Sequence, residues 1–376
     1  MTRSLVVSCA LVMGCGSDDV PAIGSEIAGC DGAALMASDP MLSMRGVWPV
    51  GARTVSIGSL TAEVWYPAEP GSEAGLPTVR YDIRTALPPA EAAKIPTPDN
   101  PWQDCACTRD LPLDTAHGPY PVIVFVHGTA AFRHQSLALV THWASRGFVV
   151  LAADHPGLTL RDLIGSVCGG PSVTQDLQAD LDRELAAIAD PRDQLGFLAG
   201  HVDASQVAIA GHSAGGNAAA LATGKPGVRV AIAMAANRPA APSTTLASTL
   251  FLAGSADTVV SPNQAEIGWS NSPVPRRFVR LADAGHLAFS DLCATVNAEG
   301  QDLLDIAVEH GVCGAQLAGA LFDCDPAYLD AQTGWNIINH AATGVLEPTL
   351  QCQPQSDLTT LTATYPAVDR YLEQLR

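Results

Sequence analysis

The chain has 376 residues, of which 47% are hydrophobic and only 15% charged, with 33 glycines and 27 prolines. This composition excludes a disordered or coiled-coil protein and indicates a loop-rich globular one, long enough for a large domain with insertions. The 38 acidic residues outnumber the 20 basic ones, and the net charge of −18 argues against a nucleic-acid partner because it repels phosphate backbones.

The first residues have the pattern of an export signal. Arg3 precedes an apolar stretch over residues 5–13, which is too short to span a bilayer. Residues 11–15 resemble a bacterial lipobox, so we expect residues 1–14 to be a lipoprotein-type signal peptide and Cys15 to be lipidated. An ordinary signal peptide, cleaved nearby without lipidation, is the alternative.

A tether is predicted between the anchor and the folded part. Residues 15–45 include a small, polar, Gly/Ala-rich stretch, which suits a linker, and a single domain is expected over 46–376. Gly16 follows the cysteine and, by resemblance to known sorting preferences, disfavours retention at the inner membrane. We therefore expect a lipid-anchored protein of the outer membrane, with the periplasm or secretion as alternatives.

Cysteine usage points to disulfide bonds. Ten cysteines, less Cys9 in the signal and Cys15 in the anchor, leave an even eight, which in an oxidising compartment predicts disulfides of open connectivity. Zinc at Cys105 and Cys107 is the rival interpretation, but no CxxC pair or histidine cluster accompanies them, so we expect no metal. The eight are Cys30, Cys105, Cys107, Cys168, Cys293, Cys313, Cys324 and Cys352.

The domain is predicted to begin with a β-hairpin. Residues 53–57 and 62–66 are two alternating runs of the kind that pair in this way. Residues 68–119 follow and are rich in proline, which denies the backbone both a helix and a central strand, so we expect a surface insertion.

From residue 121 the pattern becomes regular. Continuous apolar runs of the kind that strands buried on both faces require lie at 122–126, 148–152, 207–210, 228–234 and 250–253. Helical spacing lies between them, at 136–146 and at 173–189. The alternation predicts an α/β fold with a mostly parallel central sheet, helices on both faces and disulfide-containing insertions.

Residues 293–360 are a possible cap or C-terminal extension, in which four of the cysteines could act as staples. Whether Trp269 or Trp335 lines a substrate site stays open, because core or loop packing is the commoner role of such residues.

A GxSxG motif stands between a strand and a helix. Residues 211–215 read Gly-His-Ser-Ala-Gly, follow the run 207–210 directly and precede an Ala-rich helical segment at 217–223. That is the context of a nucleophile elbow, whose tight turn requires small neighbours around the serine. Ser213 is therefore the predicted catalytic nucleophile.

A serine hydroxyl needs a base, and the base needs an orienting carboxylate. In this fold the order along the chain is serine, acid, histidine, which selects Asp257 after the run 250–253 and His286 after the short strand 278–281. Asp283 and Asp291 are less suited because they belong to the loop of His286 itself. The other histidines considered are His127 and His212, interpreted as structural, and His310 and His340, kept as alternatives to His286.

The oxyanion of the tetrahedral intermediate needs two backbone N–H donors. The residue after the nucleophile, Ala214, supplies one. The loop after the run 122–126 should supply the second, for which we choose Thr129, with Gly128 as the alternative.

These motifs resemble known families. Residues 121–156 look like plasma-type platelet-activating-factor acetylhydrolases and bacterial dienelactone-hydrolase-like proteins, and residues 256–286 are similar to cutinase-like polyester hydrolases. The chain departs from true dienelactone hydrolases, which have a cysteine in place of Ser213, and from cutinases in 68–119 and after 290. The resemblance implies an α/β-hydrolase fold and serine esterase activity. It rests on Val126-His127-Gly128, Ala131-Phe132-Arg133, residues 144–150, Asp154-His155-Pro156, Ala256-Asp257 and Ala284-Gly285-His286.

The expected function is cleavage of carboxylic esters through an acyl-enzyme, a reaction that requires no cofactor. The alternatives are an amidase or peptidase, a cutinase-like polyester hydrolase and, outside the enzymes, a lipid-anchored binding module on an inactive hydrolase fold. The expected partners are a small-molecule or lipid-like ester and, through the lipid anchor, a membrane. We expect a monomer.

Overall fold

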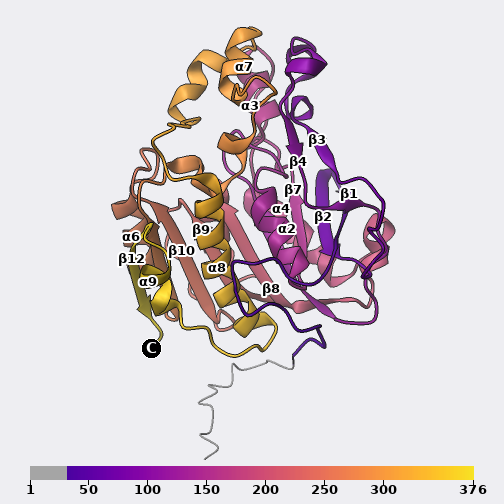
Figure 1. The fold of residues 1–376 in the computed structure, drawn as a ribbon, viewed down its shortest axis with the longest axis vertical. Helices are drawn as coiled ribbons and strands as arrows, with labels where there is room; N and C mark the ends of the chain where they lie inside the picture. The colour runs from indigo at the N-terminus through magenta and orange to yellow at the C-terminus, as the bar shows by residue number, and fades with distance from the viewer. Residues whose placement is uncertain (1–31) are drawn as a thin grey trace, which may run out of the picture.

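A ten-stranded sheet organises residues 32–376, the part of the chain that the computed structural model describes (Figure 1). The predicted signal peptide, Cys15 and Cys30 lie outside the described residues. The strand order is β12-β11-β10-β9-β8-β6-β7-β2-β1-β5. The strands are β1 (Val50–Ile57), β2 (Leu60–Pro67), β5 (Thr108–Arg109), β6 (Tyr120–Val126), β7 (Val149–Ala153), β8 (Val202–His212), β9 (Val228–Met234), β10 (Ser248–Gly254), β11 (Arg276–Leu281) and β12 (Val368–Gln374).

The centre of the sheet is parallel, as the apolar runs predict. From β7 through β6, β8, β9 and β10 to β11 all neighbours are parallel, whereas β2 pairs antiparallel with β7 and β12 pairs antiparallel with β11. Every residue of β6, β7 and β10 is buried, which explains their continuous apolar sequence. The hairpin of β1 and β2 is confirmed and turns at Gly58, whose φ of +59° suits glycine.

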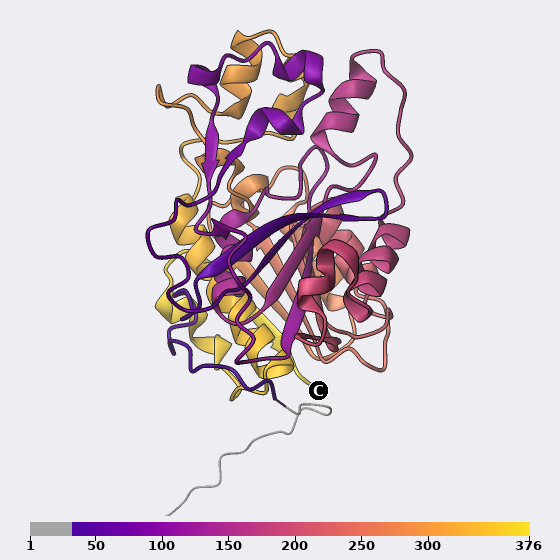
Figure 2. The ribbon, with the colours of Figure 1, turned by 90° about the vertical axis from the view of Figure 1, so that its right-hand side faces the viewer.

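Helices cover both faces of the sheet, as predicted (Figures 1 and 2). On one face, α2 and α8 pack with one buried apolar cluster, and on the other α4 and α5 pack with a second. The helix predicted over 173–189 begins later, because the Asp176 side chain accepts the Ala179 N–H and caps α4 there. The helices are α2 (Leu137–Ser145), α4 (Leu177–Ala189), α5 (Ala214–Leu221), α6 (Pro262–Ser270), α8 (Ala331–Leu350) and α9 (Leu361–Thr364). Within the described residues, no helix is long and apolar enough to cross a membrane.

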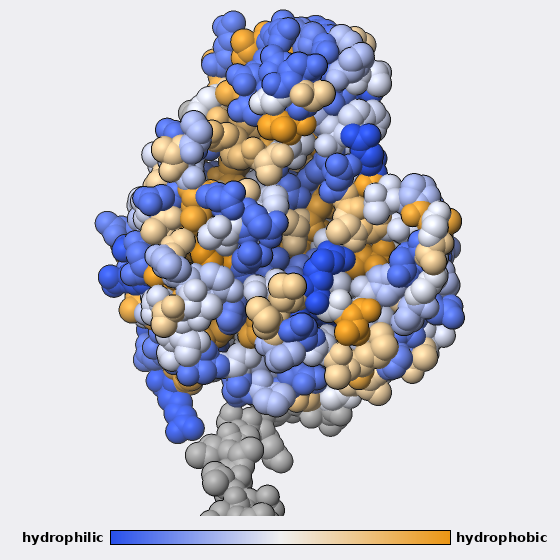
Figure 3. All heavy atoms as spheres, viewed as in Figure 1, coloured by the Kyte–Doolittle hydropathy of each residue, from blue (hydrophilic) through white to orange (hydrophobic). Residues whose placement is uncertain are grey.

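Three segments far apart in the sequence meet at one end of the molecule and form what we call the cap (Figures 1 and 2). They have an apolar cluster of their own, in which Leu87 and Ile95 pack with Ile306 and Val312. In Figure 3, hydrophilic side chains cover much of the outer end of the cap. The cap elements are η1 (Ile83–Ala86), α1 (Pro89–Ala92), η2 (Thr97–Asp99), α3 (Leu160–Val167), η5 (Leu292–Ala294), α7 (Leu303–Glu309) and η6 (Ala315–Ala320).

Residues 68–119 contribute both to the cap and to the main body. Besides the first cap segment, they contain β3 (Arg80–Asp82) and β4 (Trp102–Asp104), which form a separate two-stranded sheet, and β5, which lies at the edge of the main sheet. The prolines fall between these short elements or at the beginnings of α1 and η2, and the central strands are free of this segment.

The predicted disulfide bonds are confirmed in three pairs. Cys168–Cys313 joins the end of α3 to the connection between α7 and η6, Cys293–Cys324 closes a loop of the cap, and Cys105 is bonded to Cys107. Because the sulfurs of this last pair are bonded to each other, neither is a thiolate that could bind zinc. Cys352 is also disulfide-bonded.

Residues 32–45, which the sequence analysis includes in a tether, contact the domain. Arg146 is buried at the end of α2 and donates to the carbonyl oxygens of Asp39 and Met44 at 2.8 and 2.7 Å. Its Nε also donates to the Glu347 carboxylate on α8 at 2.6 Å. One buried guanidinium thus holds two helices and this segment together.

Candidate active site

Ser213 lies at the turn between β8, which ends at His212, and α5, which begins at Ala214. Its φ of 57° and ψ of −118° are strained for a residue with a side chain. A Cβ on Gly215 would collide with the carbonyl oxygen of Val126, so the helix approaches β6 this closely only because a glycine stands there. The predicted small neighbours therefore have a direct steric reason, and the turn lifts the serine above the carboxyl end of the sheet.

Three side chains from separate loops stand in line at this edge. His286, at the start of the short helix η4 (His286–Phe289) after β11, has its Nε2 3.1 Å from the Ser213 Oγ and its Nδ1 2.9 Å from the Asp257 Oδ2. Asp257 lies after β10, and its Oδ1 accepts the N–H groups of Val259 and Val260 at 2.8 and 2.9 Å. The carboxylate is thus held by its own loop, and the line of groups can move a proton from the hydroxyl to the imidazole.

The competing acids have other partners. Asp291 is buried, and its carboxylate accepts the Ala138 N–H at the start of α2 and the side-chain amide of Gln103. Burial raises the pKa of Asp291 to about 7, although these hydrogen bonds oppose the rise. Asp283 is exposed, and the structure gives neither acid a hydrogen bond to His286.

The alternative histidines lie elsewhere. His310 pairs with Asp99 within the cap at 3.1 Å, and His340 on α8 bonds the Tyr365 hydroxyl at 3.0 Å. Neither has a contact with Ser213 or Asp257 in the described part of the chain.

The loop after β6 adjoins the nucleophile, since a Cβ built on Gly128 would lie 3.4 Å from the Cβ of Ser213. The Gly128 N–H donates to the Gln135 Oε1 at 2.7 Å, and the Ala130 N–H donates to the Leu158 carbonyl at 3.0 Å. Between them, the Thr129 N–H has no acceptor among the described residues, and Thr129 is exposed. The Ala214 N–H is the first of α5 and has no intrahelical partner.

Sequence reasoning did not identify Gln135, which links the parts of this site. Its Oε1 accepts the Gly128 N–H, and its Nε2 donates to the His212 Nδ1 at 3.3 Å. The His212 Nε2 in turn donates to the carbonyl oxygen of His286 at 2.9 Å. Burial and the neighbouring His286 hold the pKa of His212 well below its ordinary value, so this imidazole is neutral and keeps its acceptor nitrogen. The structural role expected for His212 is thus a positioning one. A lone glutamine before a helix carries no sequence signal that would predict this role of Gln135.

His127 also holds the loop that contains Gly128 and Thr129. Its Nδ1 donates to the Gly128 carbonyl at 2.8 Å, and its Nε2 accepts the backbone N–H of His155 at 3.1 Å. Burial lowers the pKa of His127 to about 4, which keeps the ring neutral and able to make both bonds. The His155 Nδ1 in turn lies 3.3 Å from the Asp180 Oδ2.

Glu184 is buried beside this network, and neither of its carboxylate oxygens has a hydrogen-bond partner in the described residues. Burial raises its pKa from 4.5 to about 7. At a pH between these two pKa values, the folded protein holds a proton on Glu184 that the unfolded chain has lost. The free energy of unfolding therefore falls as the pH rises from 4.5 to about 7. We expect Glu184→Gln to be more stable than the parent at pH 8 by about 3 kcal/mol and nearly equal at pH 4.

Urea unfolding of both proteins at the two pH values checks this expectation, with the exposed Glu69→Gln as control. An equal change in stability at pH 4 and pH 8 would contradict it.

A family model described as Chlorophyllase matches residues 111–237. The match runs from before β6 to the end of β9 and therefore includes Ser213 and the loop of Thr129, but it ends before Asp257 and His286. No curated protein sequence matches the chain.

Among solved structures, a ferulic acid esterase from Streptomyces cinnamoneus matches with a TM-score of 0.57 and 20% sequence identity, over 90% of this chain and 95% of that one. Together with the strand order and the elbow, this match shows the α/β-hydrolase fold that the sequence predicts. The chain therefore has this fold. The Chlorophyllase model describes an esterase family of this fold, and it supports the esterase class without identifying a substrate.

Proposed function

We propose that the chain is a serine esterase that cleaves carboxylic esters through an acyl-enzyme, with Ser213 as nucleophile, His286 as general base and Asp257 as orienting acid. The observation that carries this proposal is the line of hydrogen bonds from the serine Oγ through the imidazole to the carboxylate, 3.1 and 2.9 Å long. The match to an esterase family model over the nucleophile segment supports esters as the substrate class.

In this proposal, His286 takes the Ser213 proton while the oxygen attacks the ester carbonyl carbon. The carbonyl oxygen becomes an oxyanion, which accepts hydrogen bonds from the Thr129 and Ala214 N–H groups. As the intermediate collapses, the carbon–oxygen bond to the alcohol breaks, and the imidazolium returns its proton to the leaving alkoxide. Water, deprotonated by His286, then attacks the acyl-enzyme and releases the acid and free Ser213.

The residues that surround the proposed oxyanion site support this assignment. The Gly128 N–H is already bonded to Gln135, so Thr129 is the member of the loop with a donor to offer. His127 and Gln135 hold the loop from two sides and keep that donor in place before substrate arrives. Donors fixed in advance cost no reorganisation at the moment of reaction.

Labelling with a fluorophosphonate probe tests the proposal directly, because only an activated serine reacts. We expect one label per chain, on the peptide that contains Ser213, and faster turnover of 4-nitrophenyl acetate than of the matched nitroanilide. A panel of nitrophenyl esters of increasing acyl length would then define the substrate. Absence of labelling would favour a binding module, and equal turnover of the anilide would favour an amidase.

We further propose that the enzyme is exported and anchored through lipidated Cys15, acting as a monomer on small or lipid-like esters. The disulfide bonds support an oxidising compartment, because structural disulfides are rare in the reducing cytosol.

A further inference from the structure

A cleft of about 510 Å³ lies away from the proposed catalytic residues, between α2, α8 and the β4 region. None of Ser213, Asp257 and His286 lines it. Figure 1 labels α2, α8 and β4, the elements that contribute many of its lining residues. Its volume is within the range of small-molecule sites. The lining residues include Arg45, Trp102, Gln103, Asp104, Thr141, His142, Asp291, Thr295, Gln332, Trp335, Asn336 and Asn339.

The charged groups of this lining already have hydrogen-bond partners within the protein. The Asp104 carboxylate accepts from Arg80 at 2.8 Å, and the Arg45 guanidinium donates to the Thr141 hydroxyl and the Ala106 carbonyl at 2.9 and 3.1 Å. Asp291 accepts from the start of α2. A neutral ligand would leave these hydrogen bonds intact, whereas a charged ligand would compete with them.

Two tryptophans and a set of side-chain amides remain for a ligand. Trp102 and Trp335 are only partly buried, and indole rings offer flat apolar faces; the Arg80 guanidinium lies over one face of Trp102 and leaves the other for a ligand. Asn336 accepts from Gln332 at 2.9 Å and has no acceptor for its Nδ2 among the described residues. Asn339 is 5% exposed, and its Oδ1 has no donor in the described part of the chain, although its Nδ2 donates to the Ala138 carbonyl. A buried acceptor without a donor is costly, and a ligand hydroxyl would supply one.

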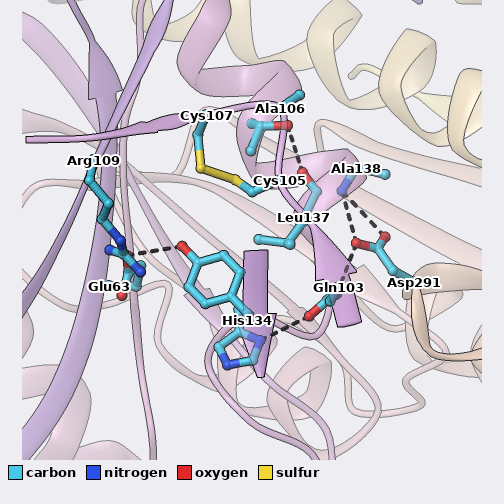
Figure 4. Close-up of a disulfide and its surroundings, with 12 residues drawn as sticks. Glu63, Gln103, Cys105, Ala106, Cys107, Arg109, His134, Leu137, Ala138 and Asp291 are labelled. Atoms are coloured by element: carbon cyan, nitrogen blue, oxygen red, sulfur yellow. Dashed lines mark hydrogen bonds and ion pairs between the residues drawn. A yellow bond between two sulfur atoms is a disulfide. The ribbon is translucent and has the colours of Figure 1, made fainter. Parts of the chain in front are cut away.

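Hydrogen bonds fix the position of Gln103 in the lining of the cleft. Gln103 stands between His134 and Asp291: its Oε1 accepts from the His134 Nδ1 at 2.9 Å, and its Nε2 donates to Asp291 at 3.2 Å (Figure 4). The Cys105–Cys107 bond lies next to it. Fixed groups bind with less loss of conformational entropy than mobile ones do.

We propose that this cleft binds a neutral oligosaccharide segment. Sugars combine an apolar ring face, which stacks on indole, with hydroxyl groups that both donate to and accept from carboxamides. Two indoles and unused amide groups, beside charged groups that already have hydrogen-bond partners, fit that combination better than they fit a purely apolar ligand. The site holds sugar without cleaving it and is independent of the ester chemistry proposed for Ser213.

Calorimetric titration of the whole protein with cellotetraose and xylotetraose tests this proposal, with tetragalacturonate as the anionic comparison. We expect saturable one-to-one binding of at least one neutral tetrasaccharide. Trp102→Ala should weaken it about tenfold, as loss of a stacking partner predicts, and Asn336→Ala should also weaken it. Ser213→Ala should bind as the parent does, so a failure of the esterase proposal would not be mistaken for a failure of this one.

Trp269→Ala is the matched control. Trp269, on α6 and therefore on the other face of the sheet, is also partly buried and also has a guanidinium over its ring, Arg276 at 5.0 Å compared with Arg80 at 5.3 Å over Trp102. This control should bind tetrasaccharide unchanged. No saturable binding of either neutral sugar, binding that Trp102→Ala and Asn336→Ala leave unchanged, or tighter binding of tetragalacturonate would each overturn the proposal.

Discussion

Ser213→Ala is expected to lower kcat for 4-nitrophenyl acetate by on the order of 10⁶, the loss typical of removing a triad serine. The hydroxyl bonds the imidazole of His286, so its removal takes away the nucleophile and leaves the turn intact. Alanine fits the space of the serine Cβ, and the melting temperature should stay within a few degrees of the parent. Steady-state kinetics and thermal unfolding of the same preparations check both halves of this expectation.

The control for this substitution is Ser243→Ala, because the Ser243 hydroxyl bonds Thr245 far from the elbow. It should hydrolyse the ester as the parent does. Turnover by Ser213→Ala above a hundredth of the parent rate would show that another group is the nucleophile.

Asp257→Asn is expected to lower kcat by on the order of 10⁴, as carboxylate-to-amide changes do in triads of this kind. Its Oδ2 lies 2.9 Å from the His286 Nδ1 and fixes the tautomer in which Nε2 can accept the serine proton. An amide at this position can donate to Nδ1 and favour the opposite tautomer. The Val259 and Val260 N–H groups would still find an amide oxygen, so the loop should keep its conformation.

Asp283→Asn provides a matched control in the loop of the histidine. Asp283 is exposed, and asparagine tolerates its φ of 55° as well as aspartate does. We expect its kcat to stay within threefold of the parent. A large loss in Asp283→Asn together with a small one in Asp257→Asn would reassign the acid.

Residues next to the cap contact the loop of the proposed base. Tyr328, in the segment that leads from the cap to α8, lies against Gly285 beside the proposed base, and its hydroxyl donates to Asp323 at 2.6 Å. The Leu329 N–H donates to the carbonyl oxygen of Asp283. The loop of the proposed base is therefore covered from the cap side.

Most of the central fold could be predicted from the sequence because its signals are local. A strand buried on both faces must be apolar throughout, and β6, β7 and β9 were placed to within two residues on that basis. The elbow was found in the same way, since only small residues fit around a serine at positive φ. The sequence does not predict α8, although it is the longest helix among the described residues. It is buried along most of its length, so it lacks the polar face that would mark an amphipathic helix.

What the sequence by itself determined is the parallel sheet and the serine at its turn, because both depend on neighbours within a few positions. It also predicted which acid and which histidine would serve the proposed reaction. Only the tertiary structure decided which cysteines pair, that three distant segments make one cap, and that Gln135 accepts the Gly128 N–H while the Thr129 N–H has no acceptor in residues 32–376. The physical reason is that these outcomes depend on distances between residues remote in the chain. Packing of the complete molecule sets such distances, and no local pattern records them.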